Sequence, residues 1–177
     1  MKKALLLFSI LLMIASCKKE VSKTTVDANT ESKWQEISEV KTVNYAELKP
    51  YLERNDDKTY IVNFWATWCA PCVKELPYFE KIKQEYASKN VEVLLVSLDF
   101  PKQVEKKLIP FINRKKLESN VILLNDIDEN VWIKAIDSTW SGALPATLIY
   151  TKNTRKFYEQ SFDYNSLETE LKTFLKP

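Results

Sequence analysis

The chain contains six short apolar runs whose length and composition are typical of β-strands. They are predicted at residues 36–43, 60–65, 91–98, 121–124, 146–150 and 156–161. The run at 91–98 has four consecutive aliphatic residues, which predicts a strand buried on both faces. The last two runs flank a polar turn centred on Asn153, so they predict a β-hairpin.

Between these runs, apolar residues recur at the spacing of a helix. Helices are predicted at residues 44–54, 71–89, 101–117, 128–136 and 165–175, with Asn44 and Asp128 as N-caps. The second helix has one apolar face, formed by Val73, Leu76, Phe79, Ile82 and Tyr86. Pro77 is expected to kink this helix, and Pro110 to divide the third into a bent helix or two short ones. Strands that alternate with helices predict an α/β fold, and the hairpin makes its sheet mixed.

The first residues have the pattern of an export signal. Lys2 and Lys3 precede an apolar stretch at 4–14, which is too short to span a membrane. Ile14-Ala15-Ser16-Cys17 resembles the bacterial lipoprotein box, in which the cysteine is acylated and becomes the mature N-terminus. This predicts a signal peptide at 1–16, a lipid-anchored flexible tether at 17–33 and one domain at 34–177. Ordinary secretory cleavage, with Cys17 incidental, is the alternative.

Composition excludes several classes of function. The chain has no His, which removes His-based catalysis and His metal sites. Its one Gly, Gly142, excludes a phosphate-binding glycine loop. Without Lys2 and Lys3 the chain carries 24 basic and 24 acidic residues, which argues against nucleic acid as a partner.

The most informative motif is Trp68-Cys69-Ala70-Pro71-Cys72, between a predicted strand and a predicted helix. Two thiols at this spacing can close and open a disulfide, and a helix N-terminus stabilises the attacking thiolate. The motif therefore predicts thiol–disulfide exchange. A zinc site needs further ligands, and the domain has no third Cys and no His. A permanently closed structural disulfide is the alternative.

The order of these elements resembles the thioredoxin fold. The segments 63–72 and Glu75-Leu76-Pro77 resemble the TlpA/ResA-type family of membrane-tethered, extracytoplasmic thiol–disulfide oxidoreductases. The resemblance covers the chain from about Trp34 onward. It implies a mixed central sheet flanked by helices, with an insertion at 101–136 before a cis-proline loop.

The resemblance also implies roles for individual residues. Cys69 would be the exposed nucleophile, and Cys72 the shielded thiol that resolves the mixed disulfide. Leu144-Pro145 would form the cis-proline loop that receives substrate, with the sole glycine, Gly142, meeting a backbone demand nearby. Trp68 would line the rim of the site.

Glu75 corresponds to an acidic residue of the family that assists proton transfer at the buried thiol. The alternative is an ordinary solvated helix residue. Asn63 stands where plain thioredoxins have a buried Asp, which favours Glu75 as the substitute. Trp65, Trp132 and Trp140 are expected to pack in the core, with Trp140 also able to shape the substrate groove.

The residues between Cys69 and Cys72 predict the direction of electron flow. Ala70 and Pro71 supply no charge and no side-chain donor to hold a very stable thiolate, so a reductant is expected. Asp126-x-Asp128-x-Asn130 is interpreted as a helix cap and not as a calcium loop, because Val131 occupies the position that needs Gly.

The sequence therefore predicts an envelope thiol–disulfide oxidoreductase that needs no bound cofactor and no metal. Its partners would be protein disulfides, apocytochrome c being one family precedent, and a membrane thiol donor. A thiol peroxidase and a non-catalytic adaptor remain alternatives.

Overall fold

The computed structural model describes residues 35–175, which lie within a compact unit at Trp34–Pro177. The predicted signal peptide, Cys17 and the tether lie outside the described residues. Six strands form one sheet: β1 (Lys41–Val43), β2 (Thr59–Trp65), β3 (Val91–Ser97), β4 (Asn120–Leu124), β5 (Ala146–Tyr150) and β6 (Arg155–Tyr158). Their spatial order is β1-β4-β3-β2-β5-β6. The first four are parallel neighbours and the last two are antiparallel, so the predicted mixed α/β sheet is confirmed.

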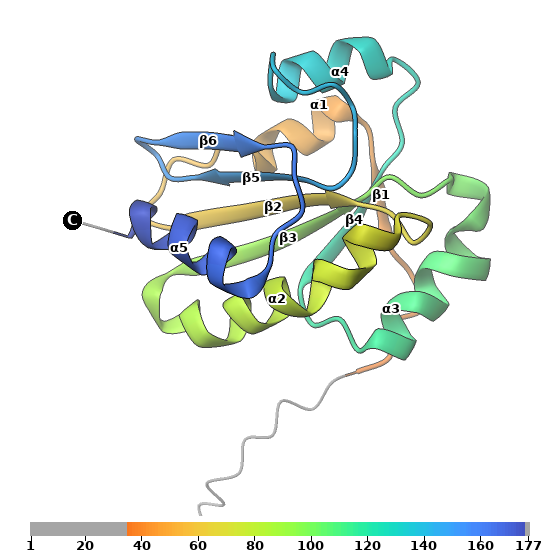
Figure 1. Cartoon of the computed structure of the whole chain (residues 1–177). Coiled ribbons are helices and arrows are strands. Elements are labelled where there is room, and N and C mark those ends of the chain that lie inside the picture. The colour runs from red at the N-terminus through yellow and green to blue at the C-terminus, as the bar shows by residue number, and fades with distance from the viewer. Residues whose placement is uncertain (1–34, 176–177) are drawn as a thin grey trace, which may run out of the picture. The chain divides into compact units, whose positions relative to one another are not determined.

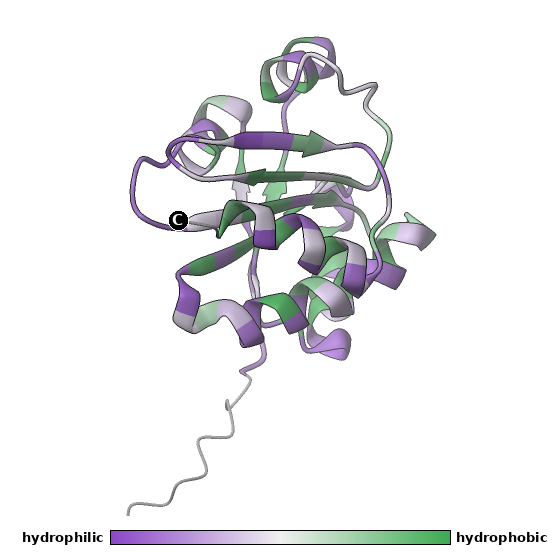
Figure 2. Cartoon of the chain, turned by 60° about the vertical axis from the view of Figure 1, so that its left-hand side comes forward, coloured by the Kyte–Doolittle hydropathy of each residue, from purple (hydrophilic) through white to green (hydrophobic). Residues whose placement is uncertain are grey.

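Helices cover both faces of this sheet (Figure 1). The helices α2 (Ala70–Tyr86), α3 (Ile109–Lys115) and α5 (Tyr164–Phe174) lie on one face, and α1 (Tyr45–Leu48) and α4 (Glu129–Ile136) lie on the other. Alternation along β2 supplies both cores: Ile61 faces α2, whereas Val62 and Phe64 face α1 and α4. Figure 2 shows this as green central strands, with the edge strand β6 mostly purple.

The predicted helix boundaries were right where the motif lies. The helix α2 begins at the CxxC motif and runs unbroken past Pro77, with a 3₁₀ turn at Ala87–Lys89 completing it. Its predicted apolar face is buried except for Val73, which is partly buried. Asn44 caps α1 as predicted, because its side chain accepts from the Glu47 N–H at 2.9 Å.

Three predictions about local structure were wrong in part. Residues 36–40 are not part of a strand. The backbone N–H and C=O of Ile37 form hydrogen bonds with the side chain of Asn113 and not with a neighbouring strand. The helix expected at 44–54 is the short α1 followed by a 3₁₀ turn at Lys49–Tyr51. Asp128 is the N-cap residue of α4, but its side chain makes no capping hydrogen bond.

The segment at 101–117 divides before Pro110 and not at it. A 3₁₀ turn at Pro101–Gln103 and a π-helical turn at Val104–Leu108 precede α3. Pro110 lies in the first turn of α3, a position at which proline is tolerated. In residues 35–175, no helix combines the length and the hydropathy that crossing a membrane requires.

Candidate active site

Cys69 and Cys72 form a disulfide at the N-terminal end of α2, just after the turn that follows β2. Their Cα atoms are 5.3 Å apart. Cys69 is the N-cap of α2, and its Sγ accepts a hydrogen bond from the Cys72 N–H at 3.3 Å. A thiolate formed at this sulfur after reduction would therefore meet the positive end of the helix dipole.

Accessibility distinguishes the two sulfur-bearing residues less than expected. Cys69 is 6% exposed and Cys72 is fully buried. The order agrees with an attacking Cys69 and a shielded Cys72. The expectation of an openly exposed Cys69 was wrong for this disulfide form, because the residue belongs to the core cluster on the α2 face.

Glu75 lies one turn after Cys72 on the buried face of α2. It is 1% exposed, so the alternative of a solvated surface residue is wrong. Its carboxylate accepts hydrogen bonds from Asn63 Nδ2 at 2.9 Å and from the Phe162 N–H at 2.8 Å. Burial nevertheless raises the pKa of Glu75 from 4.5 to about 7. A group with this pKa can hold or release a proton near neutral pH.

Asn63 connects Glu75 to the strand that follows the proline loop. Its Nδ2 also contacts Thr147 Oγ1 at 3.1 Å and the Ala146 carbonyl at 3.4 Å. Its Oδ1 is buried and has no hydrogen-bond partner within the described part of the chain. The structure thus ties α2, β2 and β5 together through one carboxylate and one amide.

The proline loop has the predicted backbone. The Leu144–Pro145 peptide bond is cis, and Gly142 has a φ of +95°, a region that side chains other than glycine rarely adopt. A Cβ at Gly142 would also lie 3.1 Å from Ile133 Cδ1. The sole glycine is therefore required on two counts.

Two side chains hold this loop, and the sequence analysis selected only one of them, Trp140. Glu159, at the end of the hairpin, accepts from the backbone N–H groups of Ser141 and Ala143 and from the Ser141 hydroxyl. The hydroxyl and the two amides lower the pKa of Glu159. Trp140, fully buried as predicted, donates from Nε1 to the Ala143 carbonyl at 3.0 Å. No sequence signal marked Glu159, because its partners are backbone groups 16 and 18 residues away.

A second unpredicted residue, Asp99, binds the segment before the cysteines. Asp99 is 3% exposed, and its carboxylate accepts from the Thr67 N–H at 3.0 Å and the Thr67 hydroxyl at 2.5 Å. The Ser97 hydroxyl donates to the same carboxylate at 2.9 Å. Asp99 follows β3, whose parallel pairing with β2 brings it to the same end of the sheet as Thr67. A carboxylate directly after a buried strand was the available signal.

A groove of about 450 Å³ lies beside Trp68 and the proline loop. Its apolar lining includes Trp68, Phe100, Trp132 and Leu144, and Trp68 and Phe100 are 58% and 62% exposed. Its charged lining residues are all acidic: Asp99, Asp126 and Glu129. Trp68, the residue before Cys69, thus contributes its exposed ring to this groove.

No cluster of three or more Cys, Asp or Glu side chains suited to a metal ion occurs within residues 35–175. Asp126, which belonged to the rejected calcium loop, accepts from the backbone N–H groups of Tyr45 and Asp128.

Comparison with known proteins agrees with this geometry. The sequence profile of the AhpC/TSA family matches residues 27–155. The chain is 33% identical over 111 residues to the thiol-disulfide oxidoreductase ResA of Geobacillus kaustophilus, covering 60% of this chain and 58% of that protein. It is 31% identical over 119 residues to ResA of Bacillus anthracis, covering 67% and 62%. The chain thus spans less than two thirds of the length of these relatives.

Solved structures share the fold. A thiol:disulfide interchange protein of the thioredoxin family from Chlorobium tepidum has a TM-score of 0.57 at 18% identity, over 72% of this chain and 85% of that one. The thioredoxin domain of a Bacteroides vulgatus thiol-disulfide oxidoreductase has a TM-score of 0.55 at 21% identity, over 71% and 83%. The predicted thioredoxin fold is confirmed.

Proposed function

Because the chain belongs to the AhpC/TSA family, with a CxxC disulfide at the start of a helix, we propose that it is a thiol–disulfide oxidoreductase that reduces disulfides in exported proteins. The observation that carries the proposal is the Cys69–Cys72 disulfide at the start of α2, with the buried Glu75 one turn further along the same helix. A purely structural disulfide would need neither a buried carboxyl group with a pKa of about 7 nor an apolar groove beside Trp68.

In the proposed reaction, the reduced protein gives two electrons to its substrate. The Cys69 thiolate attacks one sulfur of a substrate disulfide, and the other substrate sulfur leaves as a thiolate that takes a proton from water. The Cys72 thiol then loses its proton, and its sulfur attacks Cys69 Sγ. This closes the Cys69–Cys72 disulfide and releases the second substrate thiol.

Glu75 is the residue placed to assist the second step. It lies three positions after Cys72 on one face of α2, and its pKa of about 7 suits proton exchange with a buried thiol. The groove beside Trp68 and Leu144 would hold the substrate segment next to Cys69. Protein disulfides are favoured over small-molecule disulfides as substrates, because the exposed apolar lining would otherwise stay in contact with water.

The cellular setting follows from the leader. An acylated Cys17 would anchor the protein at the envelope with its domain on the extracytoplasmic side. A membrane thiol donor would then return two electrons to the disulfide after each turnover. Apocytochrome c, whose haem-attachment cysteines must be reduced, is a candidate substrate by family resemblance.

The test is reduction of insulin disulfides by the protein with dithiothreitol as the electron source. The wild type should accelerate insulin reduction, and Cys69→Ser should abolish the acceleration. Cys72→Ser should accumulate as a mixed disulfide with insulin, because its Cys69 can still attack. Cys17→Ala is the matched control, since it removes a thiol outside the motif and should keep full activity.

Three results would contradict the proposal. Acceleration by Cys69→Ser equal to that of the wild type would remove Cys69 from the chemistry. Consumption of hydrogen peroxide at a rate exceeding insulin reduction would identify a thiol peroxidase, and absence of both activities would leave an adaptor.

A further inference from the structure

The segment from Lys102 to Lys116 is unusually basic, and we call its exposed basic side chains together the basic surface. It contains six basic side chains and one acidic side chain, Glu105. All six basic residues are exposed: Lys102, Lys106, Lys107, Arg114, Lys115 and Lys116. The rest of the chain without its leader lysines must then carry an excess of acid, since the whole is balanced.

These charges are not neutralised by ion pairs. Seven ion pairs occur among the described residues, and none of them includes a residue of the basic surface. Arg114 instead lies over the Phe111 ring at 5.5 Å. The neighbouring carboxylate of Glu36 contacts the amide of Asn113 at 3.3 Å. Within residues 35–175 these six cations form no ion pair, and with Glu105 the segment has a net formal charge of +5 (six basic residues minus one acidic residue).

The described chain begins against the same surface. Asn113, in the middle of α3, accepts from the Ile37 N–H at 3.1 Å and donates to the Ile37 carbonyl at 2.9 Å. Figure 1 shows the first described residues running beside α3. The segment that leads back to Cys17 therefore joins the domain next to the basic surface.

We propose that the basic surface binds the anionic headgroups of the membrane that carries the lipid anchor. This inference rests on the proposed acylation of Cys17 and on the charge of the surface. The steps from Cys17 to residue 35 can extend over at most about 60 Å, so a lipid attached at Cys17 keeps the membrane within reach. Each Lys or Arg near an anionic bilayer strengthens binding about fivefold, and the attraction acts within a Debye length.

Binding in this orientation would place the active-site groove close to the membrane. Phe100 and Pro101 line the groove and directly precede Lys102, the first residue of the basic surface. The Cys69–Cys72 disulfide would then lie near the bilayer surface, within reach of the proposed membrane thiol donor. An acidic protein partner is the rival occupant, and the membrane is favoured because the chain's own proposed anchor leads to this surface.

Co-sedimentation with vesicles tests the inference. The protein used is the chain from residue 17 with Cys17→Ala, which carries no lipid and keeps the whole unit at Trp34–Pro177. The vesicles contain phosphatidylcholine alone or phosphatidylcholine mixed with phosphatidylglycerol. Binding should need phosphatidylglycerol and should weaken steeply as salt is added.

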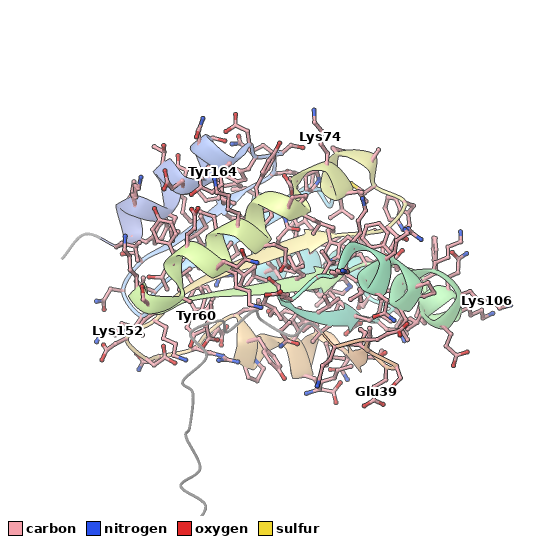
Figure 3. The ribbon with its side chains drawn as sticks, turned by 90° about the horizontal axis from the view of Figure 1, so that it is seen from below. Glu39, Tyr60, Lys74, Lys106, Lys152 and Tyr164 are labelled. Carbon is pink, nitrogen blue, oxygen red and sulfur yellow. A yellow bond between two sulfur atoms is a disulfide. The ribbon has the colours of Figure 1, made fainter. Side chains whose placement is uncertain are left out.

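The decisive comparison uses two variants of equal charge change. Lys106→Glu/Lys107→Glu should weaken binding to phosphatidylglycerol vesicles by at least about 25-fold, at about fivefold per residue. The control is Lys74→Glu/Lys89→Glu, whose residues are exposed and form no ion pair within the described chain. Figure 3 shows Lys74 and Lys106 at different edges of the domain. The control should lose only a few-fold.

Three results would overturn the inference: no binding to phosphatidylglycerol vesicles, equal binding to both kinds of vesicle, or equal loss in both variants. Insulin reduction by each variant in solution should match the wild type, so failure of the proposed function is seen separately. Mass spectrometry of the protein from membranes reports acylation of Cys17 independently of both.

Discussion

Glu75 makes a quantitative prediction about stability and pH. Burial raises the pKa of Glu75 to about 7 in the folded protein, against 4.5 for the unperturbed group. The folded state therefore holds the proton more tightly than the unfolded chain. The stabilisation is complete below about pH 4.5 and is lost as pH rises to about 7, above which it stays constant.

The magnitude follows from this difference in pKa. Between these two pKa values, each rise of one pH unit lowers the free energy of unfolding by about 1.4 kcal/mol. Between about pH 5 and pH 8 the loss from Glu75 alone amounts to about 2.5 kcal/mol, a large part of the stability of an ordinary domain. The two hydrogen bonds from Asn63 and Phe162 oppose the effect of burial but do not cancel it.

Glu75→Gln removes this titration and keeps the shape of the side chain. The new side-chain amide of the variant would place an N–H group opposite the Asn63 Nδ2 donor. This is unfavourable unless the Asn63 side-chain amide rotates by about 180° and presents its Oδ1 instead. That rotation is available, because the Asn63 Oδ1 is buried without a partner in the described chain and could accept from Gln. The variant should therefore fold, with a flatter dependence of stability on pH.

The assay is urea unfolding of the oxidised proteins at about pH 5 and pH 8. The free energy of unfolding of the wild type minus that of Glu75→Gln should fall by about 2.5 kcal/mol between the two values. Glu39→Gln is the control, since it removes a carboxyl group from an exposed position and should leave the difference nearly constant. If the wild type and Glu75→Gln change in parallel with pH, the assignment of a raised pKa to Glu75 is wrong.

Three further predictions concern the loops and the redox couple. Glu159→Gln should raise the KM for insulin by about fivefold with little change in kcat. The hydrogen bonds of Glu159 position the proline loop, and a neutral amide accepts weaker hydrogen bonds than a carboxylate. An unchanged KM would refute this role. Asp99→Asn should destabilise the protein by about 1–3 kcal/mol in urea unfolding, because the buried donors from Thr67 and Ser97 lose an acceptor; an unchanged midpoint would contradict this role. Equilibration with glutathione or dithiothreitol buffers should give a potential nearer about −270 mV than about −120 mV, and a value above about −180 mV would indicate an oxidase or isomerase.

The sequence alone was sufficient for the reactive pair and its local frame. The apolar run of β2, the cysteines and the periodic face of α2 are close in sequence, and their pattern determines where the strand ends and the helix begins. Gly142 was informative for the same reason, because a single glycine indicates a local backbone demand, whereas the cis bond at Leu144–Pro145 was expected only from the family resemblance. Even there, sequence could not say that Cys69 is largely buried, which depends on the core around it.

The tertiary structure decided every property that depends on residues distant in sequence. Glu75 could have been a solvated helix residue until Asn63 and the Phe162 N–H, 12 and 87 residues away, were found beside it. The roles of Asp99 and Glu159 became visible only in the structure, because the backbone N–H groups that they bind come from other parts of the chain. Periodicity reports burial along one element, whereas the pKa of a carboxyl group and the position of a loop are set by what packs against it from other elements.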